Sequence, residues 1–329
     1  MMRLSQLETL IHVAELGSLS RAAERMHIAQ PALSRQVRML ERELGMRMFD
    51  RHGRGMVLTE SGQKVLHHAY RVLGELDEIR SVAAEGDTGL RGHLSVGLPP
   101  TVADMLTLPL VTAMTERHPN STLRVVSAYS RFLLDWLRRG DIDLAVLYEV
   151  GAIRTLRTMP LLDEELHLIG PPDAGLSIDR PVPFSDLAGA QMLLPSRGHG
   201  LRNLLDAAAA EAGFDLAVRV EADSYSTIKD LVKAGHGLTI LPLAPIHVEI
   251  ALGGLCHAPL VDPTPMRRLV LAVAADRSVT RLGAFASDEM VAAVQRLAHT
   301  GIWSGHLLSD SSATKTATCQ RSSETRSKS

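Results

Sequence analysis

The chain has 329 residues, which at roughly 100–200 residues per domain predicts two or three domains with enough interior for a core. Hydrophobic residues make up 45% and charged residues 22%, an ordinary globular composition, and the net charge of −2 gives no sign of a nucleic-acid partner. The charge is uneven, however, because residues 1–62 carry nine arginines and no lysine against seven acids.

Two cysteines, Cys256 and Cys319, lie far apart in the sequence. They exclude a disulfide framework and any zinc or iron–sulfur site built on several cysteines, and they fit a reducing compartment. Glu8, His12 and Glu15 interrupt the apolar run that a secretory signal needs, and no stretch approaches the roughly 18 apolar residues of a membrane helix. We therefore expect a soluble cytoplasmic protein with no membrane partner.

The first 58 residues have the pattern of three short helices followed by a β-hairpin. Apolar spacing and cap residues predict helices over residues 4–14, 21–26 and 31–44, and a glycine follows the first and third where a C-cap would lie. Residues 48–58, which contain a Gly-Arg-Gly turn, predict a small hairpin. This order of elements matches a winged helix-turn-helix, whose third helix enters the major groove of DNA.

A basic stripe lies in the second half of this segment. Residues 35–54 hold six arginines against three acids, a local charge of +3 that suits contacts with DNA phosphates. Most such runs are only solvated surfaces, and bundles of three helices are common. Composition and spacing therefore leave two interpretations open: a DNA-binding domain, or a helical bundle with exposed arginines.

Seven residues are candidates for contact with DNA because they lie off the apolar face of the third helix or on the hairpin. Arg35 and Arg38 can contact guanine edges or phosphates, and Gln30 can pair with adenine. The hairpin arginines are placed to reach phosphates or the minor groove. The candidates are Gln30, Pro31, Ser34, Arg35, Arg38, Arg51 and Arg54.

A long helix is predicted over residues 63–88. Its apolar residues step alternately by four and three positions, which is the seam of a coiled coil. We interpret it as a dimerisation helix, since no other apolar segment lies nearby in the sequence to cover the seam; the alternative is a core helix that packs on its own domain. The predicted dimer contacts are Val65, Ala69, Val72, Leu76 and Ile79.

Residues 89–302 alternate between short β-rich runs and helices, the pattern of a parallel α/β sheet. Strands are expected over residues 93–98, 122–127, 142–147, 166–169, 191–194, 218–221, 238–241 and 269–274. Together with the helices between them, these strands predict two small α/β lobes. Residues 303–329 are rich in serine and threonine and cannot bury enough surface to offset their ordering entropy, so we expect a disordered tail.

A family resemblance decides between the two interpretations of the N-terminal segment. The segment resembles, at more than a dozen positions in register, the DNA-binding signature of LysR-type transcriptional regulators. The matching runs are 17–23 (GSLSRAA), 29–37 (AQPALSRQV), 40–41 (LE), 44–45 (LG), 49–51 (FDR), 58–59 (LT) and Gly62. One departure is Ala29, where the family usually has serine or threonine as the helix cap.

The resemblance continues to about residue 300. Residues 140–145 (GDIDLA) and 231–242 (LVKAGHGLTILP) resemble the family's effector-binding domain, and residues 143–149 are similar to the nitrogen assimilation control subgroup. The implied fold is an N-terminal all-α winged helix-turn-helix followed by two α/β lobes like those of periplasmic solute-binding proteins. The implied parts are the DNA-binding domain (1–62), the linker helix (63–88), the effector domain (89–302) with lobe I (89–163 and 267–302) and lobe II (164–266), and the tail (303–329).

The same resemblance implies a small-molecule effector bound between the lobes. Strand ends meet helix N-termini there, and the free N–H groups and partial positive charge of such ends suit a small carboxylate. Hydroxyl groups can bond the carboxylate and basic side chains can add charge, although each residue can equally be an ordinary helix cap. The candidates are Thr101, Ser130, Ser196, Arg197, His199 and Arg202.

The sequence therefore predicts a ligand-responsive transcription factor that binds an interrupted dyad in double-stranded DNA. The resemblance implies a homodimer or homotetramer and contact with RNA polymerase. No Gly-x-Ser-x-Gly, P-loop or His-Glu-x-x-His motif occurs, and we expect no catalysis, no metal and no cofactor. The alternatives are a solute-binding protein, which would need a signal peptide and no winged helix, and an enzyme on the two-lobe fold.

Overall fold

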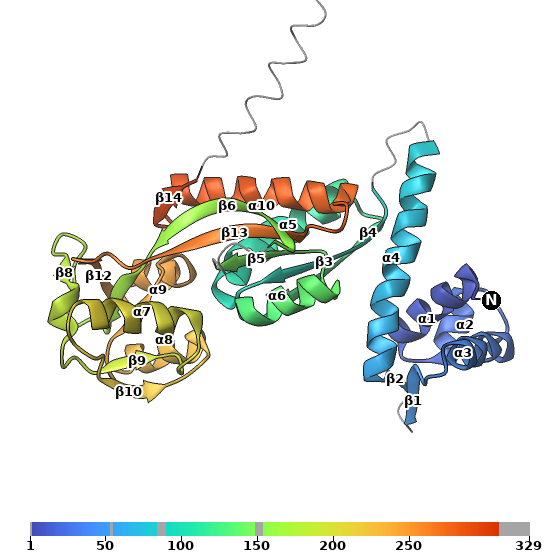
Figure 1. Cartoon of the computed structure of the whole chain (residues 1–329), viewed down its shortest axis with the longest axis horizontal. Coiled ribbons are helices and arrows are strands. Elements are labelled where there is room, and N and C mark those ends of the chain that lie inside the picture. Colours follow the sequence, from blue (N-terminus) through green and yellow to red (C-terminus); the bar gives the residue numbers. More distant parts are fainter. Residues whose placement is uncertain (1, 53–54, 84–89, 149–153, 309–329) are drawn as a thin grey trace, which may run out of the picture.

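The computed structural model describes residues 2–52, 55–83, 90–148 and 154–308. These residues form a helical N-terminal domain, a long helix that stands beside it, and two α/β lobes that follow one another away from that helix (Figure 1). The element order therefore agrees with the predicted fold class.

The N-terminal domain contains three helices and a two-stranded hairpin, as predicted. They are α1 (Leu4–Leu16), α2 (Leu19–Arg25), α3 (Gln30–Leu44), β1 (Phe49–His52) and β2 (Gly55–Leu58). α1 and α3 end at Gly17 and Gly45, whose φ of 59° and 66° lets the chain turn out of each helix. The N-cap of α3 is Ala29, and its side chain makes no cap hydrogen bond.

One apolar core holds this domain together, and α4 (Glu60–Ala83) completes it. Its fully buried side chains come from all three short helices and include Leu10, Val13, Ala22, Leu33 and Leu40. Ala69 of α4 is 1% exposed in this core, and Val65 packs against it. The expectation that Ala69 contacts a second copy is therefore wrong, because α1, distant in sequence but adjacent in space, covers this part of α4. Val65 is half-buried, and its contact with a second copy stays a prediction.

The same helix also contacts the first lobe. The ring of Tyr70 stacks on that of His93 with centroids 4.1 Å apart, and the Tyr70 hydroxyl donates to the Glu15 carboxylate of α1 at 3.0 Å. The His93 ring nitrogens lie 2.9 Å from the Thr122 hydroxyl and 3.0 Å from the Ser95 hydroxyl. Burial lowers the pKa of His93 to about 4, so the ring is neutral near pH 7. Through this stack α4 touches both the helical domain and the first lobe.

Lobe I is built on a six-stranded sheet in the order β14-β6-β13-β5-β3-β4. Its strands are β3 (Gly92–Leu98), β4 (Ser121–Ser127), β5 (Leu144–Tyr148), β6 (Leu156–Glu165), β13 (Met266–Ala274) and β14 (Gly305–Leu307). The sheet is covered on one face by α5 (Pro100–Arg117) and α10 (Arg281–His299), and on the other by α6 (Ser130–Arg139). β3 is parallel to β4 and β5 but β13 is antiparallel to β5 and β6, so the sheet is mixed rather than parallel as expected.

Lobe II contains a four-stranded sheet, β11-β7-β12-β8, and a parallel pair, β10-β9. Its strands are β7 (His167–Gly170), β8 (Val182–Pro183), β9 (Met192–Leu194), β10 (Val218–Glu221), β11 (Thr239–Leu241) and β12 (Cys256–Val261). Its helices are α7 (Gly200–Glu211), α8 (Tyr225–Lys233) and α9 (His247–Ala251), with 3-10 turns at Phe184–Leu187 and Ala244–Ile246. A separate apolar core, which includes Phe184 and Leu205, fills this lobe. Because each lobe has its own core, the connections between them set their relative position.

Two long strands run along the connection between the lobes (Figure 1). β6 and β13 form an antiparallel pair in which Leu156 lies opposite Ala274 at one end and Glu165 lies opposite Met266 at the other. The register of the pairing shifts between Leu269 and Val270. The sequence analysis missed β6, because this strand contains Pro160 and several charged residues and lacks a clear alternation. It also missed β8, β12 and β14. Pairing with β13 gives β6 its extended conformation, which its own pattern does not specify.

The segment after α10 is ordered further than expected. Trp303 is 1% exposed, and its indole N–H donates to the carboxylate of Glu164 at 2.8 Å. β14 then pairs with β6, so residues 303–308 belong to lobe I and the prediction of a disordered tail from residue 303 is wrong for them. A buried indole supplies the apolar surface that the serine-rich residues lack. Residues 309–329 lie outside the described residues.

Replacing Trp303 tests this docking. Trp303→Ala should lower the free energy of unfolding by about 3–5 kcal/mol, the usual cost of deleting a buried aromatic side chain. Trp303→Phe keeps most of the volume but leaves Glu164 without one donor, and should cost about 1–3 kcal/mol. Urea unfolding followed by circular dichroism measures both, and wild-type stability in Trp303→Ala would contradict the packing.

Candidate nucleic-acid interface and effector cleft

The exposed side of α3 carries most of the residues expected to contact DNA. Gln30 and Pro31 are exposed in its first turn, Arg35 and Arg38 are exposed along the helix, and Ser34 is half-buried. The opposite side of the helix is buried in the core described above. The structure therefore brings these five candidates together on one surface.

Backbone hydrogen bonds fix the hairpin beside the helices. The N–H of Met56 donates to the carbonyl of Gly17 at 2.9 Å, and the N–H of Thr59 donates to the carbonyl of Met48 at the same distance. Arg51 lies on β1 opposite Met56, but its side chain is outside the described part of the chain, as is the whole of Arg54. The expected contacts of these two arginines stay predictions.

Glu41, which was not among the predicted site residues, positions the segment that follows α3. Its Oε1 accepts hydrogen bonds from the N–H groups of Met48 at 2.9 Å and Phe49 at 3.4 Å. These bonds hold the segment after α3 close to the helix, so Arg47 and the hairpin keep a fixed position relative to α3. A signal was available, because Glu41 belongs to one of the runs that resemble the family signature.

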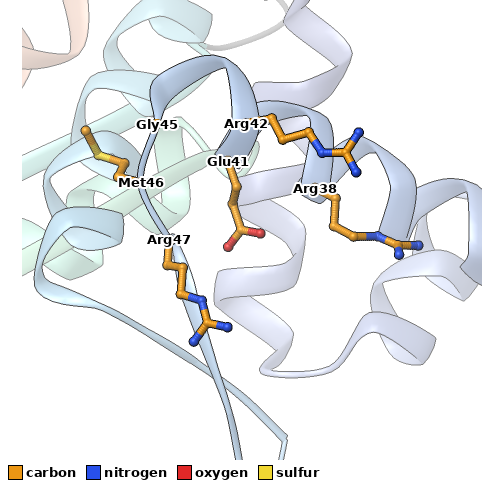
Figure 2. Close-up of a pocket in the computed structure, with 6 residues that line it drawn as sticks. All are labelled: Arg38, Glu41, Arg42, Gly45, Met46 and Arg47. Atoms are coloured by element: carbon orange, nitrogen blue, oxygen red, sulfur yellow. The ribbon is translucent and has the colours of Figure 1, made fainter.

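A hollow with a volume of about 340 Å³ lies at the C-terminal end of α3. It is lined by Arg38, Glu41, Arg42, Gly45, Met46 and Arg47 (Figure 2). Figure 2 shows Arg38 and Arg42 extending from the helix to the same side, Arg47 extending from the segment that follows, and Glu41 between them. Of the three arginines, the sequence analysis named only Arg38 as a candidate.

Three arginines at this end of the domain are exposed and lie close together in the sequence. Within the described ranges, no ion pair involves Arg35, Arg42 or Arg47. Other exposed arginines are paired, as Arg117 of lobe I is with the Glu289 carboxylate at 2.7 Å. Guanidinium groups that no acid neutralises create a positive potential on this surface, which attracts a polyanion.

The second part of the predicted dimer stripe on α4 is open to solvent. Val72 is 42% exposed and Ile79 is 67% exposed, while Leu76 is half-buried. The three residues keep the four-and-three spacing of a coiled-coil seam. Unlike Ala69, they are free to contact another helix.

Two of the expected effector residues converge on Tyr148, at the carboxyl end of β5. The Thr101 hydroxyl lies 2.9 Å from the Tyr148 hydroxyl, and the Ser130 hydroxyl accepts a hydrogen bond from the Tyr148 N–H at 3.0 Å. Thr101 is in the first turn of α5 and Ser130 is the first residue of α6, so both hydroxyls lie at helix N-termini. Tyr148 was not predicted, because a tyrosine that ends an apolar strand looks like a core residue.

A buried ion pair supports Tyr148. The Arg267 guanidinium lies over the Tyr148 ring, 3.7 Å from its centroid, and donates to the Glu164 carboxylate at 2.7 Å. Arg267 is 8% exposed and Glu164 is 1% exposed. The Arg267 Nε–H is buried and makes no hydrogen bond within the described residues. The Arg267 charge is thus balanced by Glu164 inside the protein, and one donor of the guanidinium is left unused.

Lobe II contributes a second group of polar side chains. The Ser196 N–H donates to the Asp223 carboxylate at 3.0 Å, and the Ser196 hydroxyl also donates to it. These bonds lower the pKa of Asp223. The Tyr129 hydroxyl of lobe I donates to the Asp223 carbonyl, and the His199 ring packs edge-on against the Tyr129 ring with centroids 4.6 Å apart. Tyr129 therefore joins the two lobes at the expected cleft.

The remaining lobe II candidates differ in their contacts. His199 caps α7, accepting from the Leu201 N–H at 3.2 Å, and burial lowers its pKa. Arg197 is exposed. Arg202, in contrast, is 4% exposed and its guanidinium donates to Asp206 at 2.8 Å, to Glu221 at 2.9 Å and to the Pro195 carbonyl at 3.2 Å. The expectation that Arg202 binds an effector is therefore wrong, because its guanidinium is buried and paired with two carboxylates inside lobe II.

Within the described residues, no group of three or more histidine, cysteine or acidic side chains could hold a metal ion. None of the helices in those ranges has both the length and the apolar character needed to cross a bilayer.

Known proteins match both halves of the chain. The profile of the bacterial regulatory helix-turn-helix proteins of the lysR family matches residues 4–63, and that of the LysR substrate binding domain matches residues 87–290. Among solved structures, a full-length point variant of OxyR from Pseudomonas aeruginosa is similar with a TM-score of 0.65 and 27% identity, covering 90% of this chain and 98% of that one.

Two named relatives have equal sequence identity to this chain. The DNA-binding transcriptional dual regulator OxyR of Escherichia coli (strain K12) is 32% identical over 82% of this chain and 88% of its own length. The nitrogen assimilation regulatory protein nac of Klebsiella aerogenes is 32% identical over 78% of this chain and 82% of its own length. The subgroup suggested by residues 143–149 therefore stays a prediction. The winged helix-turn-helix, the two lobes and these matches show that the chain belongs to the LysR family of DNA-binding transcription regulators, which are not enzymes.

Proposed function

We propose that this chain acts as a dimer or tetramer that binds an interrupted dyad in DNA and responds to a small organic acid bound between its lobes. The observation that carries the first part is the row of exposed arginines on α3, which no acid pairs with in the described part of the chain. The second part rests on the polar groups that converge on Tyr148.

The N-terminal half of α3 would read bases. Gln30, Pro31 and Ser34 lie in its first turns, and Arg35 and Arg38 follow on the exposed side. An arginine that donates two hydrogen bonds to a guanine distinguishes that base from the other three. Arg51 and Arg54 on the hairpin would contact the backbone or the minor groove beside it.

Pairing of α4 helices would present two copies of α3 to the same duplex. Val72, Leu76 and Ile79 would form the seam, since their side chains are not buried in their own domain. Two-fold symmetric dimers bind half-sites separated by one helical turn, about 34–36 Å, or by multiples of it. An interrupted dyad is the DNA counterpart of this symmetry.

The effector proposed for the cleft is a carboxylate. Thr101, Ser130 and His199 lie at helix N-termini, where partial positive charge and free N–H groups favour an anion, and Arg197 is exposed nearby in sequence. The N–H and the hydroxyl of Ser196 already donate to Asp223, so Ser196 would contact the ligand only by giving up these bonds. The Arg267 Nε–H offers a further donor. A ligand would change the relative positions of the lobes only through its different affinities for two arrangements. Contact with RNA polymerase follows from the family alone.

Peroxide is the alternative signal, because a relative of Pectobacterium carotovorum that is 32% identical over 82% of this chain is named a hydrogen peroxide-inducible genes activator. Proteins that sense peroxide by thiol oxidation need a reactive cysteine. None of the cleft residues named above is a cysteine, and the Cys256 thiol lies on β12, where it donates to the Pro171 carbonyl at 2.8 Å. Cys319 lies outside the described residues. A bound anion is therefore the signal that we propose.

Arg35→Ala should weaken binding to a specific duplex by about 1–3 kcal/mol and relax the preference for one base pair, because a base contact is lost. The duplex is obtained by selecting from a random library with the wild-type protein, and affinity is measured by gel retardation. The control is Arg296→Ala, which removes one positive charge from the exposed side of α10, far from α3 in the sequence. Equal discrimination by wild type and Arg35→Ala would remove Arg35 from base reading, and a wild type that selects no duplex would contradict specific DNA binding.

Ile79→Asp should convert dimers into monomers and weaken operator binding, because it places a charge in the proposed seam. Sedimentation velocity measures the oligomeric state. Ile178→Asp, at a residue of lobe II that is 60% exposed, is the matched control and should leave the oligomer unchanged. An unaltered sedimentation profile for Ile79→Asp would refute the seam.

Thr101→Val should reduce the response to a carboxylate while leaving DNA affinity intact, because it removes one hydroxyl and keeps the shape of the side chain. The probe is a panel of mono- and dicarboxylic acids, with the shift in melting temperature as the readout. Thr115→Val, at an exposed residue of the same helix, is the control. If no acid raises the melting temperature of the wild type, the carboxylate proposal is wrong; a full response in Thr101→Val would exclude Thr101 from the cleft.

A further inference from the structure

The two ends of α3 would lie at different distances from the bases. A recognition helix contacts base edges in the major groove with its N-terminal residues. The 15 residues of α3 span about 22 Å at 1.5 Å per residue, so its C-terminal end is remote from that contact. We therefore expect the side chains at the C-terminal end to meet the sugar–phosphate backbone rather than the bases.

The hollow at the C-terminal end of α3 has the composition of an anion site. Arg38 and Arg42 are four positions apart and line the same side of the hollow, and Arg47 closes it from the segment after the helix (Figure 2). Arg35, Arg38 and Arg42 follow one helical face at positions i, i+3 and i+7. The proposed base-reading surface therefore continues without a break into the hollow, and Arg38 belongs to both.

The acidic group that lines the hollow does not cancel this charge. Glu41 contributes one negative charge against three arginines, and its Oε1 already accepts hydrogen bonds from two N–H groups. The helix C-terminus would disfavour an anion, but the carbonyls of Glu41 and Arg42 accept from the N–H groups of Met46 and Gly45. Arg42 and Arg47 are exposed and make no ion pair within the described ranges. Their guanidinium groups are available to a ligand.

We propose that this hollow binds a phosphate of the DNA backbone at the edge of the groove occupied by α3, with Arg42 and Arg47 as its ligands. A guanidinium matches a phosphate in geometry and can donate two parallel hydrogen bonds to it. Such a contact is independent of sequence and fixes how far α3 slides along the groove. This inference rests on the proposed DNA binding and adds two residues that act on affinity rather than on base preference.

An acidic segment of another protein would satisfy the same charges. The phosphate is favoured because Arg38 links the hollow to the base-reading side of α3, so a protein bound in the hollow would compete with DNA for the same side chain. A DNA phosphate and an acidic protein segment should respond differently to the same set of arginine variants.

The test is the salt dependence of binding to a 30-base-pair duplex of random sequence, measured by fluorescence anisotropy with full-length protein. Each lost phosphate contact should reduce the slope of log affinity against log salt by about 0.9. Arg42→Ala and Arg47→Ala should each show this loss, and the double variant should lose about 1.8. Affinity for the selected specific duplex should fall by the same factor as affinity for random DNA, with no change in base preference.

Controls separate this inference from the proposed function. Arg42→Lys keeps a charge and should recover most of the slope, while Arg296→Ala should retain the wild-type slope. Far-UV circular dichroism should be unchanged in all variants, since neither arginine makes an ion pair with the rest of the described chain. A wild type that binds neither duplex would contradict DNA binding itself. A wild type with a normal slope that Arg42→Ala and Arg47→Ala both retain would overturn only the phosphate site, and loss of reporter transcription with unchanged DNA binding would assign the hollow to a protein partner.

Discussion

Burial of the apolar side of α3 fixes the direction in which its arginines point. Leu33, Val37 and Leu40 are at most 5% exposed, and together they immobilise the helix against α1 and α2. Rotating the helix to bury the arginines would expose these side chains and desolvate the guanidinium charges, which is far more costly. The chemistry of the exposed side therefore follows from packing on the other side.

α4 has two roles along its length. Its N-terminal part belongs to the core of the helical domain, where Ala69 is enclosed, while Val72 and Ile79 remain in contact with solvent. The Tyr70–His93 stack places lobe I against the same helix. α4 therefore contacts both the helical domain that carries α3 and lobe I.

A buried charge pair lies on the two strands that connect the lobes. β6 and β13 join two separately packed cores, and Glu164 on β6 is paired with Arg267 on β13 beside Tyr148. Breaking a buried pair leaves an uncompensated charge, so the pair constrains the strands at the point where the lobes meet. Trp303 strengthens this constraint by donating to the same carboxylate. A ligand that used the free donor of Arg267 would act directly on this joint.

The sequence alone determined the three N-terminal helices, the hairpin, the alternation of strands and helices within the lobes, and the basic side of α3. Each of these depends on residue spacing within one segment. It did not determine β6 or β14, whose conformation comes from strands distant in the chain, nor the burial of Trp303. Only the tertiary structure showed that α1 covers Ala69 and that Arg202 is held by Asp206 and Glu221, since both depend on which segments meet in space. The hollow at the end of α3 belongs to the same class: Arg47 reaches it because Glu41 holds the following segment against the helix, a contact that no local pattern specifies.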